Sequence, residues 1–558
     1  MTMAPRLPVR RLLAVLITAG LAFAAGAQED IRLPDLGSSA NALISPQEAQ
    51  DYGASMLRQM RALNMVVDDP LLDDYINDLG YRLVANCDKP KDHFAFFIVK
   101  DPDINAFAAP GGYVAVNSGL ITITQNESEL AGVIAHEIGH ITQNHLQRAF
   151  EDSKKDAPLM ALVLLGAIAA GASSHNGDAP MAVLAGGQGL IAQKSINFTR
   201  KDEIEADRVG IQTLANAGFD PNAMAGFFQR MEDVMSANSG GESVPSFLQT
   251  HPVTTERISD AKSRAGALIA ARKLHPGTAS LDRTQWEKIM APIPFVKDPA
   301  TLSRIAATGD HLSTWALMRE RVRVLSGDAP RLATYYASNL KNQHGFDTAS
   351  NRYGYALALS SSGRGALAIE QLLPLLKSHP DNLILKLALA DARLQAGQRA
   401  AALAIYAQLN TQSPRNRAVA LAYAMALTIG DDKSQARLAA SLLQPLLDKA
   451  VEPAIYSAYA RASDKAGNSV LAGEAFADAS YYSGRPFDAM EQLKRLLKRD
   501  DVDYYARVRI QARITELTPL VLELHKRRVK TDDNPDGRQQ MQQGDACSGR
   551  LCFGIGAG

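Results

Sequence analysis

The sequence predicts a mainly α-helical protein that joins an α+β domain with a small β-sheet to an α-solenoid. Runs of aromatic and β-branched residues at 94–100, 105–109 and 113–117 predict short strands among segments with helical periodicity. Residues 310–530 have the pattern of one helix after another and are rich in alanine and leucine. A chain of 558 residues is too long for one hydrophobic core, so we expect two or three domains.

The first 27 residues have the three parts of a secretory signal peptide. Three arginines precede a short apolar run, and an A-x-A cleavage signal ends at Ala27. We therefore expect cleavage near Ala27 and export of the mature chain to the periplasm. The alternative is an uncleaved membrane anchor.

The charge balance and the cysteines bear on whether the protein binds nucleic acid and whether it forms a disulfide. Lys+Arg and Asp+Glu both number 59, so the net charge is near zero, which argues against broad nucleic-acid binding. The cysteines are Cys87, Cys547 and Cys552. An exported chain permits a disulfide between the last two, and the sequence leaves open whether it forms.

Capping signals place the helices of the first half. A capping box starts a helix at 45–63, and a second helix is predicted at 71–84. Another N-x-x-E cap begins at Asn126 and opens a helix that we expect to run to about Phe150. A further helix is predicted at 200–218, where a glycine ends it.

The uncharged run at 158–173 and the glycine-rich stretch at 181–193 are ambiguous. A membrane span needs about 20 strongly apolar residues, and the run is shorter and contains many small residues. The sequence leaves open whether 158–193 is a buried helix or a peripheral membrane contact.

A 34-residue rhythm marks the second half. Gly363 and Gly397 are 34 residues apart, and so are Pro380 and Pro414. A helix–turn–helix unit of this length resembles the tetratricopeptide repeat, in which each unit buries its apolar face against its neighbours. The alternative is a helical stack without repeats.

The stretch AHEIGH at 135–140 contains candidate zinc ligands and a candidate catalytic base. His136 and His140 are four residues apart on a predicted helix, so both imidazoles project from one face and can reach one zinc ion. Glu137 lies beside that face and can take a proton from a water. Gln143 and Leu146 exclude the metzincin pattern, which needs other residues at those positions.

The third ligand is expected in EIEAD at 203–207. Glu203 and Asp207 share one helix face, so Glu203 can bind the ion while Asp207 accepts the N–H of a ligand histidine. We expect Glu205 to point elsewhere without such a partner. His145 is about half a turn out of phase with His136, so we expect a structural role for it. The alternative is a solvated acidic helix face.

The two short strands before AHEIGH suggest a substrate edge. Zincin substrates commonly add a strand to an exposed sheet edge, so we expect Tyr113 and Val114 to meet the substrate. Gly111 and Gly112 would let a peptide approach closely. The alternative is an ordinary hairpin.

Taken together, HEIGH, EIEAD, NAFAAPGGYVAVNSG and THPVTTERISD resemble the M48 family of zinc metalloproteases over roughly residues 45–270. The resemblance implies a zincin-like α+β fold and one zinc ion per chain, held by His136, His140 and Glu203. It implies that Glu137 is the general base. A zinc ion would polarise the scissile carbonyl and lower the pKa of its water to about 7.

The resemblance also gives a role to His251 in THPVTTER. It implies that this histidine can fill the open zinc position and keep the enzyme latent; the alternative is a loop residue. Arg257 could bind a carboxylate or a substrate carbonyl, and its role is left open. The segment 158–198 matches the place of a loop over the active site.

These patterns divide the chain into five parts: a signal peptide at 1–27, a metalloprotease domain at 28–272, a connecting segment at 273–309, tetratricopeptide-type repeats at 310–530 and a disordered tail at 531–558. The resemblance implies an endopeptidase that degrades misfolded or stalled outer-membrane proteins and assists their assembly. It implies that the repeats contact the β-barrel assembly machinery. The alternative is a repeat-based chaperone or scaffold with a latent protease. An aminopeptidase is disfavoured, because the sequence has no motif for a free amine.

Overall fold

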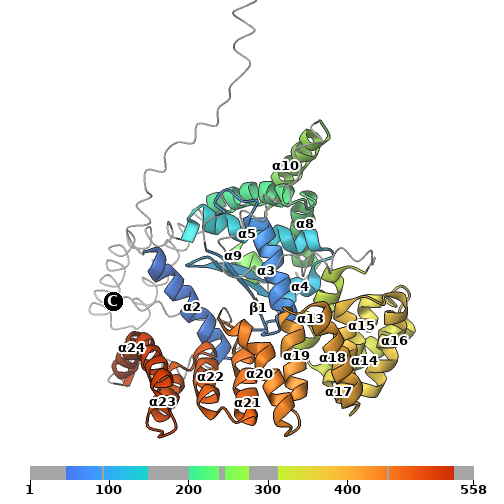
Figure 1. The fold of residues 1–558 in the computed structure, drawn as a ribbon. Helices are drawn as coiled ribbons and strands as arrows, with labels where there is room; N and C mark the ends of the chain where they lie inside the picture. The colour runs from blue at the N-terminus through green and yellow to red at the C-terminus, as the bar shows by residue number, and fades with distance from the viewer. Residues whose placement is uncertain are drawn as a thin grey trace, which may run out of the picture. The chain divides into compact units, whose positions relative to one another are not determined.

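The computed structural model describes residues 45–90, 93–146, 148, 200–237, 246–274, 312–448 and 451–532 (Figure 1). Several predicted features lie outside these residues: the signal peptide at 1–27, the segment at 158–193, most of the connection at 273–309, and Cys547 and Cys552. Among the described helices, none is both long enough and apolar enough to cross a membrane.

The three predicted strands form one small sheet. They are β1 (Ala95–Val99), β2 (Ala106–Ala109) and β3 (Tyr113–Asn117), in the order β1-β3-β2. The central strand β3 is parallel to β1 and antiparallel to β2. All five residues of β3 are buried, because the strand has neighbours on both sides and helices on its faces.

The turn between β2 and β3 depends on two glycines. Gly111 and Gly112 have φ angles of 80° and 81°, a region that residues with a side chain avoid. A Cβ on Gly112 would lie 1.6 Å from the carbonyl oxygen of His93, and one on Gly111 would lie 2.5 Å from that of Ala49. The chain itself fills this space, so the packing of the turn requires both glycines, and their contact with a peptide stays a prediction.

Helices surround the sheet. Before and after it come α2 (Pro46–Ala62), α3 (Pro70–Val84), α4 (Ser118–Ile123), α5 (Glu127–Thr142), a helix at 200–216, α8 (Asn222–Ala237), α9 (Ser246–Thr250) and α10 (Thr255–Leu274). The predicted capping box of α2 is present: Ser45 N–H donates to Glu48 at 2.8 Å, and Glu48 N–H donates to the Ser45 hydroxyl at 3.2 Å.

The central helix α5 starts where the sequence predicts and ends earlier. Its cap is Asn126, whose side chain accepts the N–H of Glu129 at 3.0 Å. The predicted helix is interrupted: α5 ends at Thr142, and residues 145, 146 and 148 are helical again after a turn at 143–144. Asn144 has a φ angle of 57°, a left-handed conformation that asparagine tolerates and that ends the α-helical path.

The second half is a row of helical hairpins. They are α13 (Thr314–Ser326), α14 (Ala329–Asn342), α15 (Ala349–Ser361), α16 (Gly365–Ser378), α17 (Leu383–Gln395), α18 (Arg399–Gln412), α19 (Arg417–Leu427), α20 (Lys433–Leu447), α21 (Pro453–Ala466), α22 (Ser469–Tyr482), α23 (Pro486–Leu497) and α24 (Tyr504–Asp532). Gly363 and Gly397 turn the chain with φ angles of 74° and 77°, which confirms the 34-residue rhythm. The tail predicted from 531 begins inside α24.

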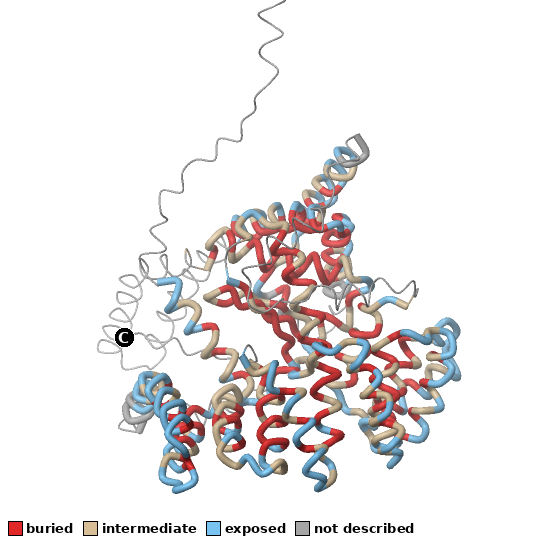
Figure 2. The backbone as a smooth tube through the Cα atoms, viewed as in Figure 1, coloured by how far each residue is buried: buried red, intermediate tan, exposed pale blue. Residues whose placement is uncertain are grey.

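The first repeats pack directly on the α+β domain through α3. Helices α13 and α19 both contact α3, and α13 also contacts α4. One cluster of buried apolar residues extends from the sheet into the first repeats. Figure 2 shows buried residues in both parts. At this junction Arg321 donates from Nε and Nη2 to the two carboxylate oxygens of Asp69, both at 2.7 Å. Asp69 also caps α3 by accepting the N–H of Leu72.

We expect Arg321→Met to lower the free energy of unfolding by about 2–3 kcal/mol, because it leaves a largely buried carboxylate without its counter-charge. The two side chains are only 12% and 13% exposed. Thermal or urea unfolding of purified protein measures the change.

The matched control is Arg352→Met, which removes a two-pronged arginine–aspartate pair of the same kind at the surface. Arg352 and Asp347 are 36% and 49% exposed, so this change should cost less than about 1 kcal/mol. Equal decreases in the free energy of unfolding of the two variants would show that the junction pair stabilises the protein no more than the surface pair does.

Candidate metal centre

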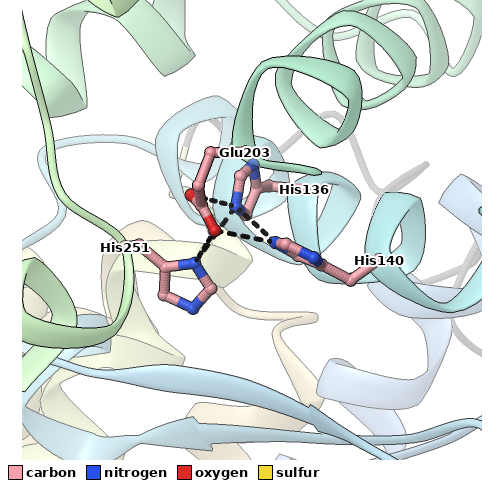
Figure 3. A group of neighbouring side chains, drawn as sticks. All are labelled: His136, His140, Glu203 and His251. Atoms are coloured by element: carbon pink, nitrogen blue, oxygen red, sulfur yellow. Dashed lines mark hydrogen bonds and ion pairs between the residues drawn. The ribbon is translucent and has the colours of Figure 1, made fainter. Parts of the chain in front are cut away.

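Four side chains from three segments meet at one point (Figure 3). His136 and His140 come from α5, Glu203 from the helix at 200–216, and His251 from the residue after α9. One nitrogen or oxygen from each lies within 4.8 Å of those of the others. The sequence predicted this set, and the fold brings all four together.

The spacing of these atoms matches a tetrahedral metal site. Nε2 of His140 lies 3.0 Å from Nε2 of His136, and the Glu203 oxygens lie 3.3 Å from each. Ligand atoms about 2.1 Å from a tetrahedral zinc ion lie about 3.4 Å apart. Two imidazoles and a carboxylate are also donors that zinc prefers, so the residues fit the ion.

His251 stands where a fourth ligand would. Its Nδ1 lies 2.9 Å from Oε1 of Glu203 and 3.4 Å from Nε2 of His136. The backbone N–H of His251 donates to the carbonyl of Phe247 at 2.7 Å, and the Phe247 ring packs against the imidazole. The residue is 8% exposed, so it is held in the site and is not a solvated loop residue.

Glu137 is buried beside the cluster. It is 1% exposed, and its Oε1 has no hydrogen-bond partner among the described residues. The same oxygen lies 3.6 Å from Nε2 of His251. A buried carboxylate oxygen without a partner is costly, which is typical of a group kept for a reaction.

Asp207 and Arg257 stand behind His136. Oδ1 of Asp207 lies 2.9 Å from Nδ1 of His136, so it can hold the ring with Nε2 facing the cluster. Arg257 donates to both Asp207 oxygens at 2.7 and 2.8 Å, and its Nη1 lies 2.9 Å from Glu203. The sequence left open whether Arg257 binds a carboxylate or a substrate carbonyl; here it binds two carboxylates and balances their charge.

The electrostatics of the centre favour a cation. Burial disfavours a charged His136, yet the carboxylates of Glu203 and Asp207 raise its pKa to about 10. Burial acts against Glu203 too, but the facing imidazoles His251 and His136 lower its pKa. Burial lowers the pKa of His140, so this ring is neutral and its lone pair is available. The same field attracts a metal cation.

His145 and Glu205 have contacts that the sequence did not predict. Nδ1 of His145 lies 2.8 Å from Nδ1 of His140, and its Nε2 lies 3.2 Å from Oε2 of Glu205. Glu205 also accepts from Arg148 at 2.9 Å. Glu205 therefore has partners, which the sequence did not predict. Burial and the neighbouring His140 lower the pKa of His145 to about 4.

The two residues predicted to meet a substrate strand, Tyr113 and Val114, lie on the central strand of the sheet and not at an edge. Tyr113 and Val114 belong to β3, whose two sides are paired with β1 and β2. A paired central strand has no free N–H and C=O groups for a substrate, so these two residues cannot form the edge that the sequence predicted.

We expect Asp207→Asn to weaken zinc binding about 10- to 100-fold, because the amide holds His136 less firmly and removes a nearby negative charge. Competition with a chromophoric chelator measures the affinity. Asp260→Asn is the control, since Asp260 pairs with Arg264 at the surface of α10 and is not one of the cluster residues. An unchanged affinity in Asp207→Asn would contradict the role assigned to this carboxylate.

Comparison with known proteins agrees with this geometry. Residues 70–265 match the sequence model of peptidase family M48. The chain is 42% identical over 258 residues to a putative β-barrel assembly-enhancing protease of Vibrio cholerae, covering 46% of this chain and 52% of the relative. It is 45% identical to the β-barrel assembly-enhancing protease of Yersinia pestis, covering 45% and 50%.

A more distant relative is the mitochondrial metalloendopeptidase OMA1 of Schizosaccharomyces pombe, 30% identical over 33% of this chain and 50% of the relative. The chain spans about half the length of the curated relatives it matches. Every residue of the cluster lies inside the matched segment. Residues 70–265 of this chain therefore form a peptidase family M48 domain.

Proposed function

We propose that the chain is a periplasmic zinc endopeptidase that degrades misfolded or stalled outer-membrane proteins and assists their assembly. The observation that carries this proposal is the convergence of His136, His140 and Glu203 with the buried Glu137 beside them. The relatives named β-barrel assembly-enhancing protease support the substrate class. The predicted signal peptide supports the compartment.

The side chains divide the work of peptide hydrolysis. His136, His140 and Glu203 would hold the zinc ion, which would supply a Lewis acid for the scissile carbonyl and for the attacking water. Glu137 takes the water's proton on its free Oε1 and passes it to the leaving amine. Asp207 keeps His136 in the tautomer that presents Nε2 to the site.

The free edge of β2 is the best place for a substrate strand. The outer side of β1 is covered, because Val67 N–H donates to Ile98 and Lys100 N–H donates to Met65. The outer side of β2 has no strand partner among the described residues, and β2 packs on α5. We propose that an extended peptide pairs with β2 and so lies along the helix that carries Glu137.

We expect Glu137→Gln to slow cleavage of an unfolded model protein about 10²- to 10⁴-fold, because the amide cannot accept the proton. Zinc content should stay at one per chain, since Glu137 is not a ligand. Peptide release and metal analysis on the same preparation measure both.

Glu256→Gln is the matched acid-to-amide control, at an exposed position on α10. It should cleave as fast as the wild type. Cleavage by Glu137→Gln at the wild-type rate would defeat the proposed mechanism.

We expect His251→Ala to cleave faster than the wild type. The imidazole fills the fourth position that the reaction needs open, so its removal frees that position. Rates for the wild type, for His251→Ala and for His251→Ala with Glu137→Gln measure this. A slower His251→Ala enzyme with normal zinc content would argue against the blocking role.

The seated His251 also favours a second candidate function. A blocked centre beside a large helical repeat region suits a chaperone or scaffold for outer-membrane protein assembly whose protease stays latent. In that case Glu137→Gln would still restore outer-membrane assembly in a strain that lacks the gene. Failure of this variant at normal abundance would leave the endopeptidase as the function.

A further inference from the structure

We propose that His145 is a positioning residue for the metal centre: it accepts a hydrogen bond from the ligand His140 and anchors that ring to Glu205. This proposal rests on the proposed metal-dependent function. The contacts are short and specific, with 2.8 Å between the Nδ1 atoms of the two histidines and 3.2 Å from His145 Nε2 to Glu205.

The hydrogens on these rings follow from geometry. Nε2 of His140 faces the cluster, so a ligand His140 keeps its lone pair there and carries its hydrogen on Nδ1. Two ring nitrogens 2.8 Å apart share one hydrogen, so Nδ1 of His145 must be the acceptor. His145 then carries its own hydrogen on Nε2 and donates it to Glu205.

The end of α5 makes this contact feasible. On a continued helix, His145 would lie five residues beyond His140 and would point away from it. The helix ends at Thr142, and the left-handed Asn144 redirects the chain. The two imidazoles consequently meet edge to face, with ring centroids 4.8 Å apart and planes at 80°. His145 is 4% exposed.

The two ligand histidines thereby have similar supports, each of which includes a carboxylate from the helix at 200–216. Behind His136 stand Asp207 and then Arg257. Behind His140 stand His145, then Glu205, and then Arg148 at 2.9 Å. The helix at 200–216 supplies both carboxylates as well as the ligand Glu203, while His145 and Arg148 follow α5 and Arg257 lies on α10.

The contacts behind His140, from His145 to Glu205 and Arg148, should act mainly by fixing the orientation of the His140 ring. The Glu205 side chain is 43% exposed and that of Arg148 is 40% exposed, so solvent screens their charges. The Asp207 side chain is 4% exposed and is screened far less. We therefore expect the loss of the acceptor at His145 to matter more than the loss of charge at Glu205.

Three substitutions at position 145 separate these roles. His145→Asn keeps a polar atom near the place of Nδ1 and can still accept from His140. His145→Gln reaches toward Glu205 but leaves nothing beside His140, and His145→Ala removes both contacts. Zinc affinity by chelator competition is the first readout. The absorption bands of the cobalt-substituted protein, which report ligand geometry, are the second.

We expect His145→Ala and His145→Gln to bind zinc about tenfold or more weakly, with shifted cobalt bands. His145→Asn should stay within about threefold of the wild type, and Glu205→Gln should fall between them. Circular dichroism shows whether each variant is folded. If His145→Ala is not folded, the contrast between the Asn and Gln variants still decides the matter.

Equal zinc affinity and equal cobalt spectra in the Asn and Gln variants would overturn the positioning role. The wild type separates this failure from failure of the proposed function. A wild type that binds no zinc would sink both proposals. If the wild type binds one zinc ion and cleaves, but the position-145 variants have its zinc affinity and cobalt spectrum, only the positioning role of His145 is overturned.

Discussion

The close crossing of α5 with the helix at 200–216 is the constraint on which the site depends. A Cβ on Gly139 would lie 3.0 Å from the carbonyl oxygen of Ala206, and one on Gly210 would lie 3.0 Å from the backbone nitrogen of His136. The two glycines therefore let the backbones touch. This close approach brings Glu203 to Nε2 of the His136 ring and Asp207 to its Nδ1.

The sequence predicted what depends on local spacing. His136, Glu137 and His140, and likewise Glu203 and Asp207, follow from spacing on a helix, whereas the role of His251 came from the resemblance to the M48 family. The structure brings these residues together. The three strands and the 34-residue rhythm are also local patterns, and they appear as predicted.

What the sequence missed depends on contacts between distant segments. Strand order decides which strand is the edge, and nothing in the residues 105–117 specifies that β3 is central. The partner of Arg257 is 50 residues away in the chain, and that of Glu205 is 60. The contact of His145 with His140 was not predicted, because the helical phase was carried past Asn144, where α5 had already ended.

Helix α3 connects the α+β domain to the repeats, since it packs on β1 and α5 as well as on α13 and α19. Asp69 begins this helix and also binds Arg321 from the repeats. The buried cluster runs unbroken through the junction. If the α+β domain and the repeats were each produced alone, each fragment would expose apolar surface at the former junction and would be prone to aggregate. The two parts are therefore one folding unit, although their sequences look like separable domains.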